Sequence, residues 1–447
     1  MENNEQHSEK FGIILPIVLI SYFMILLDSS VVFTSTVKIS QDLKMNAQTL
    51  SWISNAYVLT FGGFQLFGGR LGDLIGRKKL FLIGLAIFSV SSLLVGLSIN
   101  PAMMITMRTV QGIGAAILAP TTLALLIDNY QGELLSRAIA YYGATAGLGA
   151  SFGLLIGGFI ASFSSWRYGF LLNVPLGIVL LLLTVKKVHE KGRLGHQSLD
   201  LMGTIFSIVG LSGIIYGING EVYRGISIVI GLIFLVMFIW QEGRAKVPMM
   251  PLKLFSSPVR MGAYISRFFF SGVSFTFLYI APQAMQNVYH FSPFKSSLMF
   301  LFMNVPQFVA ATFVPRLVAR FSNAKVALLA TIFDSISFAW MVIAGVQRGY
   351  WFALAIPMVI FGIGQGLIVS PLTSLGIADT TLDIAGSASG VVNTFHQTGQ
   401  SVGLAIVIAV TSSLSPFATV FNTAMIILML YSLVSLVADA YLTWITR

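Results

Sequence analysis

The chain alternates between long apolar stretches and short segments rich in charged residues, proline, glycine or asparagine. A helix of about 20 mainly apolar residues crosses the roughly 30 Å hydrocarbon core of a bilayer. The pattern predicts an all-α integral membrane protein. It has fourteen transmembrane helices, over residues 12–35, 49–68, 80–98, 101–127, 138–161, 168–185, 200–218, 224–241, 260–286, 294–315, 325–345, 350–376, 386–412 and 417–443.

Composition supports this class. Of the 447 residues, 56% are hydrophobic and 9% are charged, whereas an ordinary soluble domain has about 25% charged residues. The net charge of +10 belongs at the rims of a bilayer in so apolar a chain, and no nucleic-acid partner is predicted. The chain has no cysteine, which excludes disulfides, thiolate metal sites and cysteine nucleophiles.

The distribution of Lys and Arg predicts the orientation of the helices. The first ten residues carry three glutamates and one lysine, so no cleavable signal is expected. If the amino terminus is cytoplasmic, 18 Lys and Arg residues lie in inner segments and six in outer ones. This excess predicts that both termini are cytoplasmic.

A faint internal repeat divides the chain. The loop after the second span reads GRLGDLIGRKKL, and the loop after the tenth reads PRLVARFSNAK, which aligns Arg70-Leu71 with Arg316-Leu317. The two loops correspond if six helices are followed by two inserted helices and six more. The predicted units are a cytoplasmic tail (1–11), an N-terminal six-helix half (12–185), inserted helices 7 and 8 with cytoplasmic linkers (186–258), and a C-terminal six-helix half (259–447). Parallel halves of this kind bind substrate between them, near the membrane midplane.

The first of these loops resembles the signature between helices 2 and 3 of the major facilitator superfamily. The match consists of Gly69, Asp73, Gly76, Arg77 and Lys78. The glycines permit a tight reversal, and Asp73 at a helix end can hold a neighbouring helix by charge-assisted hydrogen bonds. The alternative is a basic turn with one incidental acid.

The fourth span carries Arg108, followed by Gln111, Gly112 and Gly114, and resembles the second signature of the superfamily. A cation at this depth costs roughly 2.5–3.5 kcal/mol on insertion scales, so Arg108 is expected to face a cavity or an acid. The alternative is that its side chain extends to the outer rim.

The fifth span has a glycine every fourth residue at Gly149, Gly153 and Gly157, a spacing that lets helix backbones approach closely. It resembles the third signature, which marks drug antiporters, although Leu154 stands where the family usually has proline. The run from residue 166 to 177 resembles the continuation found in fourteen-helix drug:proton antiporters.

Asp28 in the first span is similar to the first-helix acid of the same branch. Helix geometry places Asp28 about 6 Å below the outer end of the hydrocarbon core and Arg108 about 10 Å below it. We therefore expect the two side chains to lie close together. An ionisable carboxyl group at this depth is a candidate for proton coupling, and the alternative is a structural ion pair.

Other polar residues inside the predicted spans are candidates for proton coupling, for lining the cavity or for binding substrate. Asp334 and His396 are further candidates for proton coupling, with structural partners as the alternative. The resemblance implies that Arg267 and His396 line the central cavity. Asp439 is expected at the cytoplasmic rim. Candidates for an apolar substrate pocket with a few polar contacts are Trp52, Tyr57, Gln283, Asn304, Gln307 and Asn393.

Together, these motifs resemble the fourteen-helix multidrug:proton antiporters of the major facilitator superfamily. The resemblance implies a monomer in the cytoplasmic membrane of a bacterium, with two pseudo-symmetric six-helix halves and alternating access. It implies small-molecule drugs and protons as partners, and export of lipophilic, often cationic compounds. The chain has no Gly-Lys-Ser/Thr phosphate loop, so ATP is not the expected energy source, and no cofactor or metal is predicted.

Two other functions remain open from the sequence. An uptake symporter for a small nutrient could use the same fold, but it would need a more polar cavity. A channel or a membrane-embedded enzyme is the other class. Paired metal ligands inside the membrane would support an enzyme. The five histidines are scattered and only His396 lies in a span, so no enzyme is predicted.

Overall fold

The computed structural model describes residues 11–188, 200–220, 222–245, 248, 250–380 and 385–446. All regular elements in these ranges are helical. The sixteen α-helices are α1 (Ile14–Leu43), α2 (Ala47–Ile75), α3 (Arg77–Gly96), α4 (Pro101–Asn129), α5 (Gly132–Phe163), α6 (Arg167–Leu171), α7 (Asn173–Lys187), α8 (Leu201–Asn219), α9 (Arg224–Glu242), α10 (Pro258–Asn287), α11 (Pro293–Met299), α12 (Leu301–Phe321), α13 (Asn323–Ala344), α14 (Ile356–Gly376), α15 (Ala385–Thr411) and α16 (Phe417–Ile445). Three short helices of other types complete the set, at η1 (Leu252–Ser256), η2 (Val346–Arg348) and η3 (Trp351–Ala355).

Every predicted span coincides with a helix or with two consecutive helices. The sixth span contains α6 and α7, the tenth contains α11 and α12, and the twelfth contains η3 and α14. Within the described ranges, eleven segments are long and apolar enough to cross a membrane; α2, α5 and α15 do not meet that criterion there. The all-α membrane fold is therefore confirmed, and the count of fourteen spans stays a prediction.

Several helices begin where a capping side chain precedes a proline. Asn100 accepts a hydrogen bond from the backbone N–H of Met103 at 2.8 Å, and Pro101 is the first residue of α4. Ser257 and Ser292 cap α10 and α11 in the same way, each followed by proline. The side chain satisfies a free N–H group of the first turn, and proline has no N–H to satisfy. These pairs therefore fix where the spans start.

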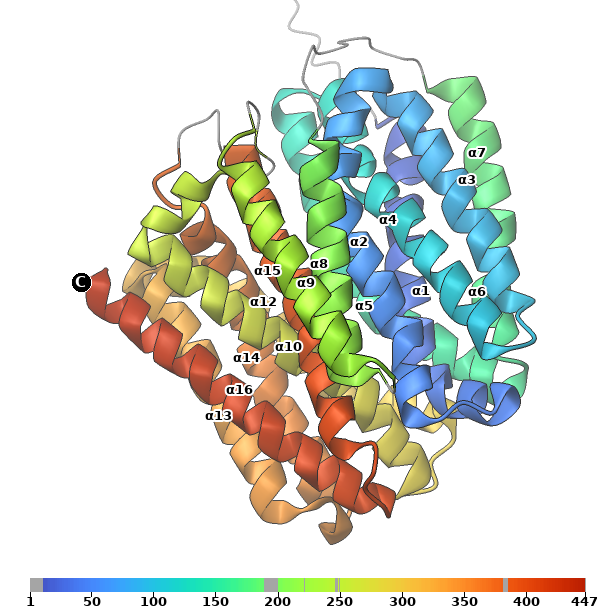
Figure 1. Cartoon of the computed structure of the whole chain (residues 1–447), viewed down its shortest axis with the longest axis vertical. Coiled ribbons are helices and arrows are strands. Elements are labelled where there is room, and N and C mark those ends of the chain that lie inside the picture. The colour runs from blue at the N-terminus through green and yellow to red at the C-terminus, as the bar shows by residue number, and fades with distance from the viewer. Residues whose placement is uncertain are drawn as a thin grey trace, which may run out of the picture.

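Two groups of helices, α1–α7 and α10–α16, are built alike. In the first, α1 packs on α5, and α4 lies between α2 and α3. In the second, α10 packs on α15, and α14 lies between α12 and α13. Figure 1 shows the first group at the right and the second at the left, with α8 and α9 in front of the line between them. Helix α8 contacts both α2 and α15, so the inserted pair bridges the two groups.

The same backbone turn occurs at equivalent junctions in both groups. Gly76, between α2 and α3, has φ 96° and ψ 135°, and Ser322, between α12 and α13, has φ 89° and ψ 159°. The alignment of Arg70 with Arg316 also aligns position 76 with position 322. The faint repeat in the sequence therefore corresponds to a repeat in the structure.

This turn predicts a gain in stability from Ser322→Gly. Backbone at these angles is populated almost only by glycine, and another residue there costs on the order of 1–3 kcal/mol. We expect Ser322→Gly to raise the midpoint of thermal unfolding of the purified protein and Gly76→Ser to lower it. A lower midpoint for Ser322→Gly would contradict the interpretation of strain at this junction.

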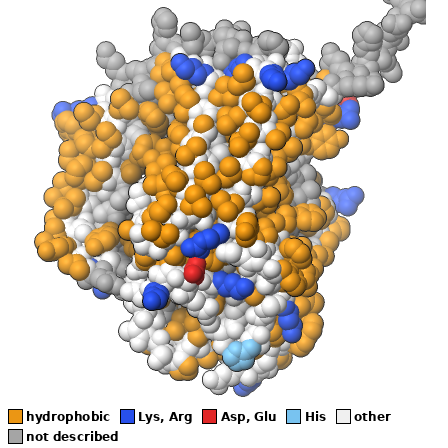
Figure 2. Space-filling model, turned by 90° about the vertical axis from the view of Figure 1, so that its right-hand side faces the viewer, with side chains coloured by type: hydrophobic (Ala, Val, Ile, Leu, Met, Phe, Trp, Pro, Cys, Tyr) orange, Lys and Arg blue, Asp and Glu red, His pale blue; other side chains and the backbone are white. Residues whose placement is uncertain are grey.

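The outer surface is suited to a bilayer. Figure 2 shows a broad apolar band on one face, with most Lys and Arg side chains near its upper edge or in its lower third. Apolar side chains such as Val236, Ile343 and Val437 are more than 60% exposed. A surface of this kind is stable against lipid and would be a liability in water.

Candidate functional site

Asp28 of α1 and Arg108 of α4 form a buried ion pair. Their side chains are 0% and 1% exposed. The Arg108 guanidinium also donates to Gln111 Oε1 at 2.7 Å and to the carbonyl oxygen of Ile53 in α2 at 3.1 Å. The prediction that Asp28 and Arg108 lie close together is confirmed.

Two amide side chains complete the network around the carboxyl group of Asp28. Gln111 Nε2 donates to Asp28 Oδ1 at 2.7 Å, and Asn173 Nδ2 of α7 donates to the same oxygen at 3.1 Å. Asn173 also donates to Ser92 Oγ of α3 at 2.9 Å. The ring of Tyr57 lies 4.2 Å from the guanidinium of Arg108, a cation–π distance. Five helices therefore meet at one charged pair.

Gln111 and Asn173 are functional candidates to which the sequence assigned no role. Gln111 follows Arg108 by three residues, so both side chains project from the same face of α4. That spacing is a usable signal. Asn173 is a single polar residue at the start of the apolar helix α7, and nothing in its spacing indicates that it reaches Asp28.

The glycines of α5 form the packing surface for α1 around Asp28. A Cβ atom on Gly153 would lie 2.7 Å from Ser30 Cβ and 3.1 Å from Leu27 Cα. A Cβ atom on Gly157 would lie 2.8 Å from Val31 Cα. Gly149 packs against Leu26 in the same way. The predicted close approach of helix backbones is confirmed.

Gly153→Ala is expected to lower transport several-fold. The added methyl group must displace α1 on both sides of Asp28, because two of its nearest neighbours belong to the Ser30 side chain and the Leu27 backbone. Gly143→Ala on the same helix is the matched control, since no atom lies within 4 Å of the position that its methyl group would take. Efflux of a fluorescent cation from cells with equal protein levels measures both variants. Equal rates for the two would contradict a role for this packing surface.

The basic loop between α2 and α3 ties helix ends together within the first group. Arg77 donates to Asp128 Oδ1 at 2.6 Å, at the end of α4. Lys78 Nζ donates to the carbonyl oxygen of Val185 in α7 at 3.1 Å. A Cβ atom on Gly69 would lie 3.7 Å from Pro120 in α4. The side chain of Asp73 is outside the described residues, so its predicted tether remains untested.

Two predicted substrate residues lie in the first group and away from each other. Trp52 faces the inserted pair, with its ring centroid 6.0 Å from that of Tyr216 in α8. Tyr57 is buried beneath Arg108. The structure does not bring these two aromatic residues to one pocket.

The remaining four predicted substrate residues belong to the second group. Gln283 of α10 is buried and donates to the carbonyl oxygen of Tyr279 at 2.8 Å. Asn304 and Gln307 lie half-buried on α12, and Asn393 lies half-buried on α15. Their roles as substrate contacts stay a prediction.

The other predicted coupling residues lie in the second group. Asp334 of α13 is 2% exposed and packs against Gly364 of α14. Asp439 of α16 is 0% exposed, and α16 packs against α13. Asp439 lies six residues before the end of α16 and is buried, and its predicted place at the cytoplasmic rim stays a prediction. His396 of α15 has its Nε2 atom 3.1 Å from Gln400 Nε2.

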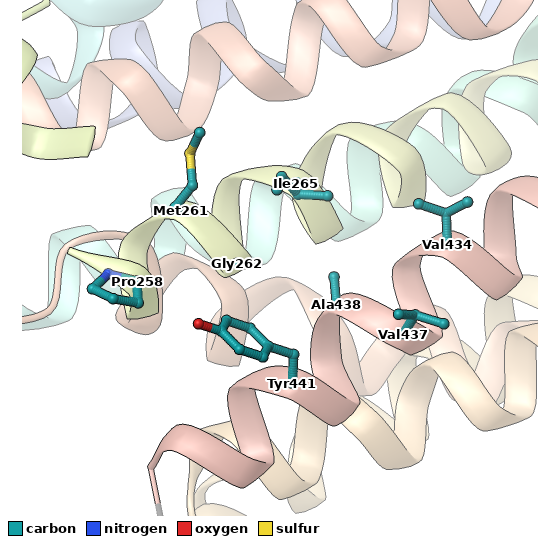
Figure 3. A pocket seen from close by; sticks show the side chains of 8 residues that line it. All are labelled: Pro258, Met261, Gly262, Ile265, Val434, Val437, Ala438 and Tyr441. Atoms are coloured by element: carbon teal, nitrogen blue, oxygen red, sulfur yellow. The ribbon is translucent and has the colours of Figure 1, made fainter. Parts of the chain in front are cut away.

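A groove of about 350 Å³ lies between α10 and α16 (Figure 3). Its lining is almost entirely apolar and includes Met261, Ile265, Val434 and Tyr441. None of the predicted site residues borders it. The groove therefore offers space for hydrocarbon but no polar chemistry.

Comparison with known proteins identifies the class to which this fold and buried network belong. Residues 18–404 match the family model of the Major Facilitator Superfamily, and the chain belongs to this superfamily of transporters. It is similar to the cephamycin export protein CmcT of Amycolatopsis lactamdurans, with 31% identity over 405 residues covering 88% of this chain and 83% of CmcT. The puromycin resistance protein pur8 of Streptomyces alboniger is 29% identical over 407 residues, covering 88% of this chain and 80% of pur8.

Solved structures show the same fold. An auto-inhibited POT family peptide transporter has a TM-score of 0.71 and 12% identity, covering 98% of this chain and 97% of the transporter chain. At this identity the likeness concerns the fold alone. Membership of the superfamily makes the chain a multi-pass membrane transporter and not an enzyme, and its relatives include a cephamycin export protein and a puromycin resistance protein.

Proposed function

We propose that the chain is a proton-coupled efflux antiporter of the fourteen-helix branch. It would export lipophilic, often cationic compounds across the cytoplasmic membrane of a bacterium, as a monomer with both termini inside. The observation that carries this proposal is the buried network of Asp28, Arg108, Gln111 and Asn173. The names of the relatives, an export protein and a resistance protein, support export over uptake.

The position of Asp28 on α1 indicates how a proton could change the conformation. Protonation of Asp28 removes the negative charge that holds Arg108, so the pairs between α1 and α4 must rearrange. The same helix meets the second group six residues further on, where Gln286 Nε2 donates to the carbonyl oxygen of Thr34 at 3.2 Å. Phe33 also packs edge-on against Phe275 of α10. Helix α1 therefore connects the charged network to the interface between the groups.

Two further hydrogen bonds between the groups lie toward one end of the bundle. Ser162 Oγ at the end of α5 accepts from the backbone N–H of Phe294 at 2.7 Å. Gln48 Nε2 at the start of α2 lies 3.5 Å from Ser412 Oγ, just beyond α15. With both termini cytoplasmic, this is the outer end. We therefore propose that this structure is the conformation in which the outer ends of the two groups are closed.

Proteoliposomes with a trapped pH dye test the proposal. An imposed gradient of ethidium should move protons in the opposite direction, with no response in liposomes without protein. Proton movement in the same direction as ethidium would indicate a symporter. Ethidium movement with no proton signal would rule out proton coupling.

A further inference from the structure

Arg267 of α10 is a buried cation without an acidic partner in the part of the chain that the structure describes. Its side chain is 7% exposed, and the described ion pairs do not include it. Nη1 donates to the carbonyl oxygen of Val369 at 3.3 Å, and the buried Nε atom has no partner among the described residues. Arg108, by contrast, has an acid, an amide and a carbonyl group. An arginine left this way inside a membrane helix is costly and marks a functional site.

Arg267 and His396 both lie close to the ring of Phe270. The guanidinium carbon is 5.8 Å from the ring centroid of Phe270, and that ring is 6.5 Å from the imidazole of His396. Counted along their helices, Arg267 is about 14 Å from the start of α10 and His396 is about 16 Å from the start of α15. Both therefore lie near the middle of a bilayer about 30 Å thick.

The imidazole also has a donor without an acceptor. Gln400 Nε2 lies 3.1 Å from His396 Nε2. With the Gln400 amide in this orientation its nitrogen donates, so Nε2 of His396 accepts and Nδ1 carries the proton. That buried Nδ1 atom has no hydrogen-bond partner among the described residues. Among the described residues, α10 and α15 thus place a cation without an acidic partner and an N–H group without an acceptor on either side of Phe270.

These groups lie on the side of α15 that faces the first half of the chain. Asn393, His396, Gln397 and Gln400 are all half-buried, and their spacing puts them on one helix face. Gly62 of α2 packs directly against the Gln397 side chain. The polar face of α15 therefore borders the interface between the two halves, where transporters of this architecture bind substrate.

We propose that Arg267 and His396, with Gln400 as support, form a subsite for the carboxylate of an amphipathic substrate. Guanidinium and carboxylate match in shape and form paired hydrogen bonds. The permanent positive charge of Arg267 and the neutral N–H donor of His396 fit a singly charged carboxylate. Phe270 supplies an aromatic surface next to this carboxylate. Asp28 cannot serve a substrate in this state, because its carboxyl group is 0% exposed and fully engaged.

This assignment rests on the proposed export function and narrows its substrate class. Compounds bearing a carboxylate, including zwitterions that also carry an amine, would be recognised in addition to plain cations. A lipid phosphate offers similar chemistry. Binding is therefore measured both in detergent and in a lipid bilayer, so that a lipid phosphate can be distinguished from a substrate carboxylate.

The test uses dansyl-phenylalanine and its methyl ester, which differ in the negative charge and in one methyl group. Binding to the purified full chain is measured by dansyl fluorescence for wild type, Arg267→Gln, His396→Gln and the control Arg316→Gln. Arg316 is an exposed arginine of α12, so the control removes one positive charge elsewhere.

We expect wild type and the control to prefer the acid over the ester about tenfold or more, equivalent to ~1.4 kcal/mol. Arg267→Gln should bring this ratio close to one, and His396→Gln should lower it.

Each outcome decides for or against the subsite. No preference in wild type, or an equal preference in Arg267→Gln, would overturn it. A preference seen in detergent but lost in nanodiscs containing phosphatidylglycerol would assign the site to a lipid phosphate instead. Ethidium-driven proton movement is measured on the same wild-type preparation. If ethidium drives no proton movement while wild type still prefers the acid, the antiport proposal is wrong and the proposed subsite is retained.

Discussion

Asp28→Asn is expected to abolish ethidium export driven by a pH gradient. Asparagine has nearly the same size and can still accept from Gln111 and Asn173, but it cannot bind and release a proton. It also leaves Arg108 without its counter-charge. We expect the rate in everted vesicles to fall at least about tenfold, the equivalent of ~1.4 kcal/mol in the barrier. Ethidium binding to the purified variant should stay within a few-fold, because the buried carboxyl group does not reach a ligand in this state.

Asp42→Asn is the matched control. Asp42 lies on the same helix and is also paired with an arginine, Arg167, at 2.6 Å, but its side chain is 50% exposed. An exposed ion pair contributes about 0–1 kcal/mol, so export by this variant should be close to that of wild type. The midpoint of thermal unfolding of each variant shows whether the protein remains folded. Wild-type export by a folded Asp28→Asn protein would eliminate Asp28 as the coupling acid and direct attention to Asp334 and His396.

The depth of Asp28 and Arg108 in the membrane could be predicted from the sequence. A helix rises 1.5 Å per residue, so counting from opposite faces of the membrane fixed the level of both side chains. The glycine spacing of α5 was equally informative, since a stripe of glycines has few uses other than close packing. A charge buried in the membrane needs a partner at the same depth, so Asp28 and Arg108 were expected to pair.

Rotation about the helix axis was not predictable in the same way. In a soluble protein, the apolar stripe of a helix shows which side is buried. A membrane helix is apolar both where it faces lipid and where it faces its neighbours, so that signal is missing. This is why the burial of Asp439 was not predicted, why Trp52 was not expected to face α8, and why Asn173 was not connected with Asp28.

The repeat also contains an asymmetry that the sequence alone did not reveal. Gln111-Gly112 in α4 has a counterpart in Gln365-Gly366 in α14. Gln365 Oε1 accepts from Ser274 Oγ of α10 at 2.8 Å, where Gln111 bonds to Asp28 of α1. The second half therefore has a neutral pair at the position of the charged one. Its own ionisable groups lie elsewhere, at Asp334, Asp439 and the Arg267–His396 subsite.

A reversible cross-link between the two halves is expected to stop transport. The chain has no cysteine, so an introduced pair has no competing thiol. Ser162 Oγ lies 2.7 Å from the backbone nitrogen of Phe294. Covalent geometry then limits their Cα atoms to about 6.6 Å apart, which is within the range of a disulfide. In a Ser162→Cys, Phe294→Cys variant, oxidation should hold the outer ends of α5 and α11 together and block the state that is open to the outside.

The control places the same kind of contact within one half. Asn422 Oδ1 of α16 accepts from the backbone N–H of Val346 at 2.9 Å, and both residues belong to the second group. If the halves move as units, an Asn422→Cys, Val346→Cys disulfide should leave ethidium export close to the reduced rate. The inter-half disulfide should abolish export, and dithiothreitol should restore it. Export that continues across a fully oxidised inter-half pair, verified by mass spectrometry, would mean that the outer ends need not separate. Transport by a rocking motion of the two halves would then be excluded.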